Sequence, residues 1–226
     1  EYMFVKPFEQ KKSNHLIPKH VDIVVVADLF ADQYLGGAEL TTEALLGSTE
    51  LTIHRINSKD ISMETLESGY NKFWVFTNYT QMDSDLIPTI ISNIRYSIIE
   101  YDYKFCRYRS IEKHLSAEMT ECNCHNELHG KLTSAFFHAA KTVFYMSNKQ
   151  MERYHTHFPF LKDDSDGSNQ YVLSSVFSEN FFATIKILRE KYSNHEKKGW
   201  LVLGSNSWIK GTNAAIAATI KLTFIL

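Results

Sequence analysis

Two glycine-containing turns in this chain have the residue types that bind phosphate groups. Gly36 and Gly37 follow a short β-branched run, residues 21–26, and precede an apolar helical pattern. Lys210 and Gly211 stand in a second turn, between another apolar run and a helical pattern. Glycines let a ligand approach the N–H groups of a helix start, and a lysine neutralises a phosphate as a point charge. These turns predict a phosphate site. The alternatives are that the glycines only relieve a tight entry into the helix and that the lysine is simply an exposed residue.

The form of the first turn excludes two common nucleotide-binding motifs. A dinucleotide fingerprint needs G-x-G-x-x-G directly after the strand, whereas this loop is long and has a single glycine pair. No G-x-x-x-x-G-K-[ST] occurs in the sequence, which argues against a P-loop kinase or GTPase.

Cysteine and histidine side chains are concentrated in one stretch and could bind a metal ion. Cys122, Cys124 and His125 stand close together, and Cys106 precedes them. Three thiolates and one imidazole form a common ligand set for structural zinc. Zinc could clip this stretch through these four residues, with His129 nearby, but the C-x-C spacing is tighter than the usual C-x₂-C and Cys106 is remote in the sequence. Reduced, partly buried thiols are therefore the default expectation.

These residues are positioned by a regular alternation of strand and helix patterns. Strands are predicted at residues 21–26, 51–56, 73–76, 96–99 and 142–146, with helical patterns between them. This alternation predicts an α/β fold with a doubly wound, parallel, Rossmann-like sheet. Residues 100–130 have no convincing periodicity, and long loops of this kind tend to be functional.

The organisation along the chain predicts two domains, of which the second is incomplete. We expect a lead-in at residues 1–20, a Rossmann-like domain at 21–170, an interdomain segment at 171–198, and the first βα unit of a second Rossmann-like domain at 199–226. The first residue is not Met, and the last residues lie inside an apolar segment. We therefore expect the sequence to be a fragment of a longer chain.

The order of these motifs resembles the GT-B-fold glycosyltransferases, particularly family 4-like enzymes. The strand, long loop, Gly-Gly-Ala-Glu sequence and helix resemble the loop at the start of their N-terminal, acceptor-side domain. The pair Lys210-Gly211 resembles the Lys-Gly pair of the donor-binding domain, whereas Ser205 stands where the family has an arginine. Residues 171–182 resemble the interdomain segment, so the resemblance covers roughly residues 21–222.

The resemblance implies roles for individual residues. Gly36 and Gly37 would lie against the diphosphate of a nucleotide sugar, and Lys210, with Gly211, would grip it. Family members often place a histidine or an acid after the fourth strand, which makes Asp102 the candidate catalytic group beside the reacting sugar. A solvated loop acid is the alternative for Asp102. Such enzymes typically need no metal cofactor, because helix starts and basic side chains stabilise the leaving diphosphate.

Composition limits the remaining function classes. The chain has 226 residues, of which 44% are hydrophobic and 22% charged, which is typical of a globular protein with a real core. A formal net charge of -2 gives no electrostatic argument for binding nucleic acid. Three cysteines favour a reducing compartment, and no apolar run is long enough for a bilayer span. We expect a cytoplasmic protein, for which peripheral membrane contact stays open.

We expect the full protein to move a hexose from a nucleotide-sugar donor to a glycan, lipid or protein acceptor. Retention of the anomeric configuration is implied by the resemblance alone. The alternative is a non-catalytic sugar- or nucleotide-binding or scaffolding relative of the same fold. Because donor contacts in this fold come largely from the C-terminal domain, residues 1–226 alone are predicted to have no transferase activity.

Overall fold

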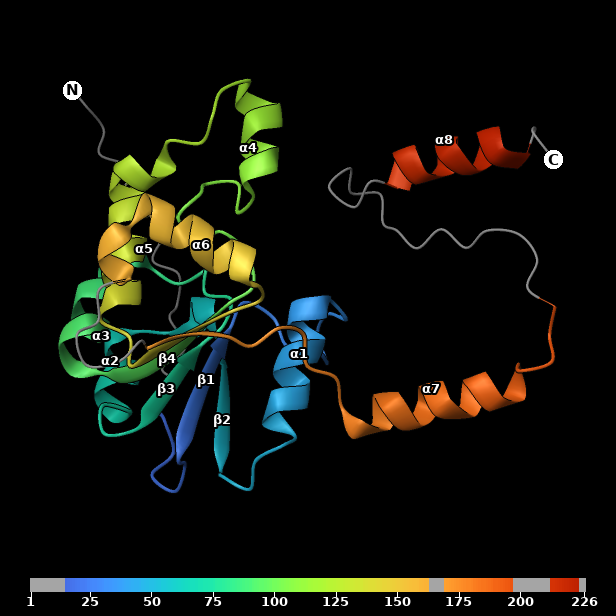
Figure 1. Cartoon of the computed structure of the whole chain (residues 1–226). Coiled ribbons are helices and arrows are strands. Elements are labelled where there is room, and N and C mark those ends of the chain that lie inside the picture. The colour runs from blue at the N-terminus through green and yellow to red at the C-terminus, as the bar shows by residue number, and fades with distance from the viewer. Residues whose placement is uncertain (1–14, 163–168, 197–211, 224–226) are drawn as a thin grey trace, which may run out of the picture. The chain divides into compact units, whose positions relative to one another are not determined.

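The structure is a computed structural model that describes residues 15–162, 169–196 and 212–223 (Figure 1). The chain divides into two compact units at residues 178 and 179. The first unit contains a parallel sheet and its covering helices. The second contains two described helices.

The first unit is an α/β domain built on a six-stranded, all-parallel sheet. Its strands are β1 (Ile23–Ala27), β2 (Ile53–Asn57), β3 (Phe73–Phe76), β4 (Arg95–Glu100), β5 (Thr142–Tyr145) and β6 (Gln170–Val172). Their order in the sheet is β2-β1-β3-β4-β5-β6. The predicted α/β class and parallel sheet are confirmed, and the sheet is consistent with a Rossmann-like fold. The last strand extends the sheet by residues that we had expected to begin the interdomain segment.

The interior strand β1, which lies between β2 and β3, has apolar side chains on both faces. Val24 and Val26 are fully buried in the main hydrophobic core, whereas Val25 and Ala27 belong to a smaller cluster with Phe30. Alternate residues of a strand point to opposite faces, so apolar side chains cover both faces of the sheet here. This explains why the sequence of β1 is continuously apolar rather than alternating.

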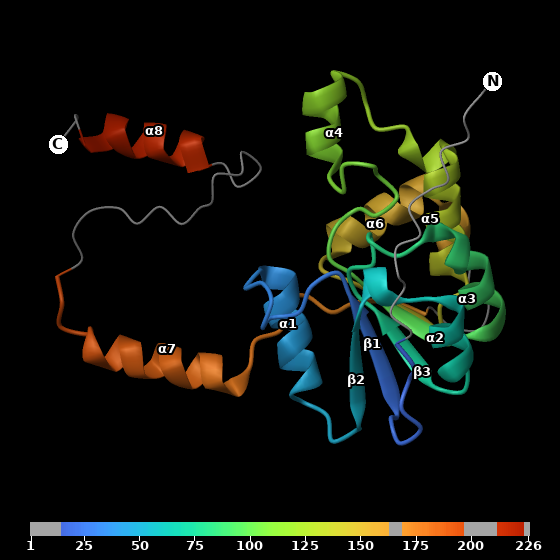
Figure 2. The same ribbon diagram turned by 180° about the vertical axis from the view of Figure 1, so that it is seen from behind.

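Helices cover the two faces unequally (Figures 1 and 2). They are α1 (Gly37–Leu46), α2 (Met63–Ser68), α3 (Ile87–Asn93), α4 (Ile111–Glu118), α5 (Leu128–His138) and α6 (Asn148–His157). Leu46 of α1 packs on the smaller cluster. The main core includes Leu66 of α2, Ile90 of α3, Phe136 of α5 and Tyr154 of α6. Four helices thus pack on one face of the sheet, and α1 packs on the other.

One helix lies in the stretch that showed no periodicity. Helix α4 begins after Ser110, whose side chain accepts a hydrogen bond from the Lys113 backbone, and ends at Met119 in the left-handed conformation. Its only buried residue is His114. A helix without an apolar stripe leaves no 3.6-residue signal in the sequence, which is why the prediction missed it.

The strand order brings several loops to one edge of the sheet. All strands are parallel, so the loops that follow them meet at the carboxyl edge. The chain passes from β1 to β2 on one side and returns to β3 on the other, which makes the β1–β3 boundary a topological switch point. Ligands of open α/β sheets bind at such a point.

The second unit contains α7 (Glu179–Lys191) and α8 (Thr212–Thr223). Helix α8 falls within the βα unit predicted at residues 199–226. Residues 197–211 lie outside the described residues, so this unit is described only by its helix. In the described part of the chain, no helix has the length and apolar character of a membrane span.

Candidate functional site

The carboxyl edge of the sheet carries a network of buried and half-buried charges. Asp28 directly follows β1 and is 7% exposed. Its carboxylate accepts hydrogen bonds from the Ser58 hydroxyl at 2.5 Å, the Thr80 hydroxyl at 2.5 Å and the Gln81 backbone at 3.1 Å. These donors come from the loops after β2 and β3. One carboxylate therefore joins the ends of three neighbouring strands.

Arg109 crosses this edge from the loop after β4. Its Nε donates to Asp102 Oδ2 at 2.6 Å, and a second guanidinium nitrogen pairs with the same carboxylate. The guanidinium also donates to Asn78 Oδ1 at 3.1 Å and lies 3.6 Å from Asp28 Oδ2. Two-point arginine–carboxylate pairing fixes both side chains. Arg109 thus connects the loops that follow β1, β3 and β4.

Beneath this pair lies a fully buried ion pair. Lys104 Nζ contacts Glu100 Oε2 at 3.0 Å, Asn78 Oδ1 at 3.1 Å and Asp102 Oδ1 at 3.3 Å. Glu100 Oε1 accepts the backbone N–H groups of Asp102 and Lys104, each at 3.2 Å. The ammonium group also lies over the Tyr79 ring, 5.4 Å from its centroid. The buried pair of Lys104 and Glu100 thus supports Asp102 and Arg109, which lie above it.

The two carboxylates of the β4 loop have opposite electrostatic environments. Burial raises the pKa of Glu100 to about 8, against the opposing effect of Lys104 and with a further increase from Asp102. Burial also raises the pKa of Asp102, but the charges of Lys104 and Arg109 outweigh it and hold that pKa below its usual value. Asp102 is therefore the ionised acid of the pair, and Glu100 binds a proton readily.

The glycine pair forms the start of α1, as predicted. Gly36 is the N-cap residue in an extended conformation, and no side chain caps the helix. A Cβ atom built on Gly37 would meet no atom within 4 Å. Open space therefore lies beside Gly37, whereas the Glu39 carboxylate and the Tyr34 ring lie close to Gly36. Unpaired N–H groups and the positive end of the helix dipole face a ligand at such a position.

A side-chain hydrogen bond joins α1 to the β4 loop. The hydroxyl groups of Thr42 and Tyr101 lie 2.8 Å apart. Burial raises the pKa of Tyr101 to about 12; the bond to Thr42 opposes this and the charge of Glu39 adds to it. The structure thus brings together the helix that begins at the glycine pair and the loop that contains Asp102. Lys210 and Gly211 lie outside the described residues.

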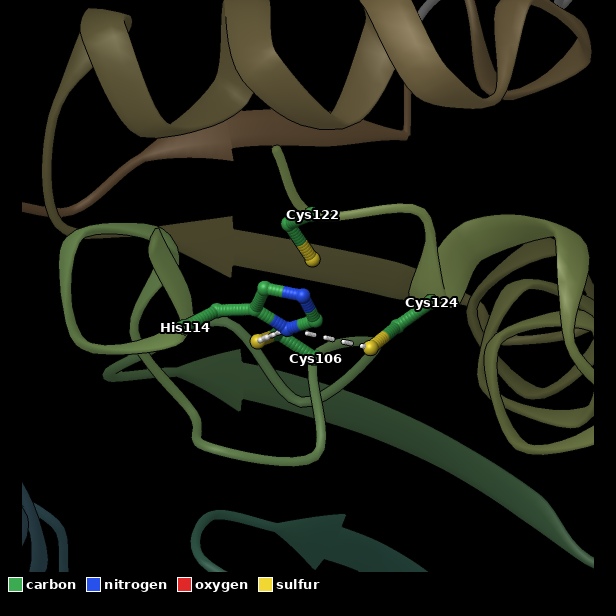
Figure 3. Close-up of side chains that lie close together, drawn as sticks. All are labelled: Cys106, His114, Cys122 and Cys124. Atoms are coloured by element: carbon green, nitrogen blue, oxygen red, sulfur yellow. Dashed lines mark hydrogen bonds between the residues drawn. The ribbon is translucent and has the colours of Figure 1, made fainter. Parts of the chain in front are cut away.

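The three cysteines also converge, but with a different histidine from the one predicted (Figure 3). Cys106, Cys122 and Cys124 group with His114 of α4, and the four ligand atoms all lie within 4.8 Å of one another. His125 instead packs its ring against His157, with the ring centroids 4.4 Å apart. The sequence prediction chose His125 for its proximity in sequence, because α4 was not recognised. The predicted ligand set is corrected to His114.

Several site residues were missed by sequence reasoning. Arg109 and Lys104 lie in the loop that the sequence marked as functional, but nothing in the sequence distinguished them from its other polar residues. Asp28 and Glu100 had a usable signal, since each stands at the carboxyl end of a predicted strand, where sites of α/β proteins form.

An apolar cavity lies away from the charged residues described above. It has a volume of about 340 Å³ and is lined by residues of α2 and α3 together with Ile94, which directly precedes β4. It therefore lies toward the amino edge of the sheet, and none of the charged residues above lines it. We assign no function to it.

Comparisons of the chain with protein-family models, with curated proteins and with solved structures found no match. A functional assignment therefore depends on the residues and geometry of the chain itself.

Proposed function

We propose that the first unit is the acceptor-side domain of a GT-B glycosyltransferase. The full protein would transfer a hexose from a nucleotide sugar to a hydroxyl group of a glycan, lipid or protein. The observation that carries this proposal is the hydrogen bond between Thr42 and Tyr101. It ties α1, five residues beyond Gly37, to the charged loop after β4, at the carboxyl edge where α/β proteins bind ligands.

The start of α1 suits the leaving group of this reaction. Glycosyl transfer expels a nucleoside diphosphate, and its developing negative charge must be stabilised. Gly37 leaves room for a phosphate to approach the backbone N–H groups of the first turn. In this proposal the glycine pair contributes dipole and hydrogen bonds, and Lys210 adds a positive charge from the second domain.

Asp102 can take part as a hydrogen-bond acceptor. Its lowered pKa makes it a weak base, so abstraction of a proton is not its best role. Its Oδ2 is engaged by two nitrogens of Arg109, whereas Oδ1 contacts Lys104 at 3.3 Å, and the side chain is 20% exposed. In this proposal Asp102 accepts a hydrogen bond from a sugar or acceptor hydroxyl and orients it.

One observation favours the non-catalytic alternative. In the described residues of this edge, the three carboxylates of Asp28, Glu100 and Asp102 are all engaged by cations or hydrogen bonds. A binding protein needs no uncommitted acid, whereas many transferases use one. The same site would then hold a nucleotide or a sugar without turning it over.

The experiment that tests the function uses the full-length protein with a panel of nucleotide sugars. Release of nucleoside diphosphate and formation of product are measured, together with nucleotide binding. We expect donor-dependent release, and no product from residues 1–226 alone. Binding without release would favour the non-catalytic role, and the absence of both would overturn the proposal.

A matched pair of variants locates the activity at α1. Gly37→Val fills open space, so it should leave the fold intact while lowering kcat/KM by about 100-fold. Gly47→Ala adds a methyl group at the other end of the same helix, 3.4 Å from the Glu43 carbonyl, and should leave kcat/KM nearly unchanged. Equal effects of the two changes would contradict a role for the glycine pair.

A further inference from the structure

Four metal-binding side chains from three parts of the chain converge inside the domain. Cys106 lies in the β4 loop between Lys104 and Arg109, His114 lies in α4, and Cys122 and Cys124 precede α5. Cys106 and Cys124 are fully buried, and His114 and Cys122 are 5% and 8% exposed. None of the three cysteines is in a disulfide.

The two distances from His114 to sulfur fit tetrahedral coordination, and all ligand atoms lie within 4.8 Å of one another. Zinc binds sulfur at about 2.3 Å and nitrogen at about 2.0 Å, so tetrahedral ligands lie about 3.5 Å apart for sulfur and nitrogen and about 3.8 Å apart for two sulfurs. His114 Nδ1 lies 3.5 Å from Cys124 Sγ and 3.8 Å from Cys106 Sγ. Figure 3 shows that the imidazole and the three sulfur atoms point into one small space.

Helix α4 has few other anchors: Ile111 packs against the main core, and Glu112 pairs with Arg153 of α6 at 2.8 Å. His114 is its only buried residue, while Leu115 is half exposed. Eight residues are too few for a helix that is stable by itself, and most helices are stabilised by an apolar face. A helix whose single buried group is an imidazole beside three sulfurs has the anchoring expected of a metal ligand rather than of a packing contact.

We propose that Cys106, His114, Cys122 and Cys124 form a structural zinc site. The protein fills all four positions of the tetrahedron, which distinguishes a structural site from a catalytic one, where a position stays open to water. On binding, each of the three thiols loses its proton to solvent, and three thiolates with one Zn²⁺ carry a net charge of -1. Arg107, which hydrogen-bonds to Cys124, partly offsets this charge.

The site would fix the loop that carries the charged residues at the edge of the sheet. Cys106 lies between Lys104 and Arg109 in the sequence, and its backbone N–H and carbonyl bond to Tyr103 and Arg109. Zinc at Cys106 would therefore hold the turn from which Arg109 reaches Asp102. This proposal is independent of the glycosyltransferase assignment.

The first test measures metal in the unmodified chain, purified without chelators under reducing conditions. We expect about one zinc ion per chain, and a cobalt-substituted sample with thiolate charge-transfer absorption and the visible bands of a four-coordinate ion. Chelation should lower Tm. Less than about 0.2 zinc per chain after incubation with Zn²⁺ and removal of excess metal would overturn the proposal, as would a native disulfide between two of these cysteines.

The second test compares two histidine variants. His114→Ala removes a proposed ligand, whereas His125→Ala removes a neighbouring histidine that lies outside the cluster. Loss of a group that merely orients a ligand costs about 10–100-fold in metal affinity, so His114→Ala should cost at least about tenfold. His125→Ala should retain stoichiometric zinc. The reverse pattern, or equal affinity of the two variants, would overturn the assignment of His114.

Discussion

Arg109 holds Asp102 with two guanidinium nitrogens, although the backbone of Arg109 has a φ of 57°. A residue with a Cβ atom loses about 1 kcal/mol or more in this left-handed region. The side chain also donates to Asn78. These contacts hold Arg109 in a conformation that its backbone alone would disfavour. The pairing of Arg109 with Asp102 therefore contributes to the stability of the domain.

We expect Arg109→Lys to lower the free energy of unfolding by about 1–3 kcal/mol, because lysine keeps the charge but loses the planar, two-point contact with Asp102. Arg55→Lys is the matched control, since Arg55 pairs with Glu43 at 2.8 Å on an exposed surface and should cost less than about 1 kcal/mol. Urea unfolding of both variants measures the difference. Equal losses would mean that the Arg109 pair has no special structural role.

Two glycine substitutions should have opposite effects on stability. A Cβ atom at Gly130 would lie 2.1 Å from the Cys124 carbonyl oxygen and 2.7 Å from His125 Cα, both backbone atoms. Gly130→Ala should therefore destabilise the domain by about 1–3 kcal/mol. Gly37→Ala enters open space and should leave stability unchanged or raise it by up to about 1 kcal/mol. Thermal unfolding tests both, and a stable Gly130→Ala protein would contradict the close approach.

Glu100 should make the stability of the domain depend on pH. Its pKa is raised from 4.5 to about 8, so the folded state binds this proton more tightly than the unfolded chain. The resulting stabilisation is fully present below about pH 4.5 and is lost as the pH rises through about 8. From this group alone, stability should fall across that range.

Glu100→Gln isolates this effect, because glutamine has a similar shape and no proton to lose. We expect the free energy of unfolding of the variant to depend less steeply on pH than that of the unmodified domain, when both are measured by denaturant titration at several pH values. Asp102→Asn is a control with the opposite sign, since the lowered pKa of Asp102 gives stabilisation that is lost as the pH falls. Parallel pH curves for Glu100→Gln and the unmodified domain would contradict the raised pKa.

Strands β1 and β5 could be predicted because each is a nearly continuous apolar run in the sequence. The run at residues 21–26 became β1 (Ile23–Ala27), and residues 142–146 became β5 (Thr142–Tyr145). The order of the strands in the sheet could not be predicted, since pairing between strands depends on contacts distant in sequence. Helix α4 was missed for a physical reason: its buried face is one imidazole rather than an apolar stripe.

The candidate site was predicted in part. Asp102 was chosen because it follows a strand, and the structure adds the cations that hold it. Its role in catalysis stays a prediction, as do the roles of Gly36 and Gly37. Arg109 could not be predicted, because its reach depends on a left-handed turn that the sequence does not mark. His114 was missed because it comes near the cysteines only when the loop is folded, and its position in the sequence does not indicate this contact.

The order β2-β1-β3-β4-β5-β6 has a consequence for synthesis on the ribosome. From β4 onward, each new strand pairs with the strand made just before it, so the sheet can grow at a single edge as the chain emerges. The reversal past β1 is completed early, within the first three strands. Parallel pairing is slow because each strand must await a crossover connection. In this domain each new strand can pair as soon as one further βα unit has been synthesised. Until then, the nascent chain exposes one unpaired strand edge, on the side of the sheet where β4, β5 and β6 are added.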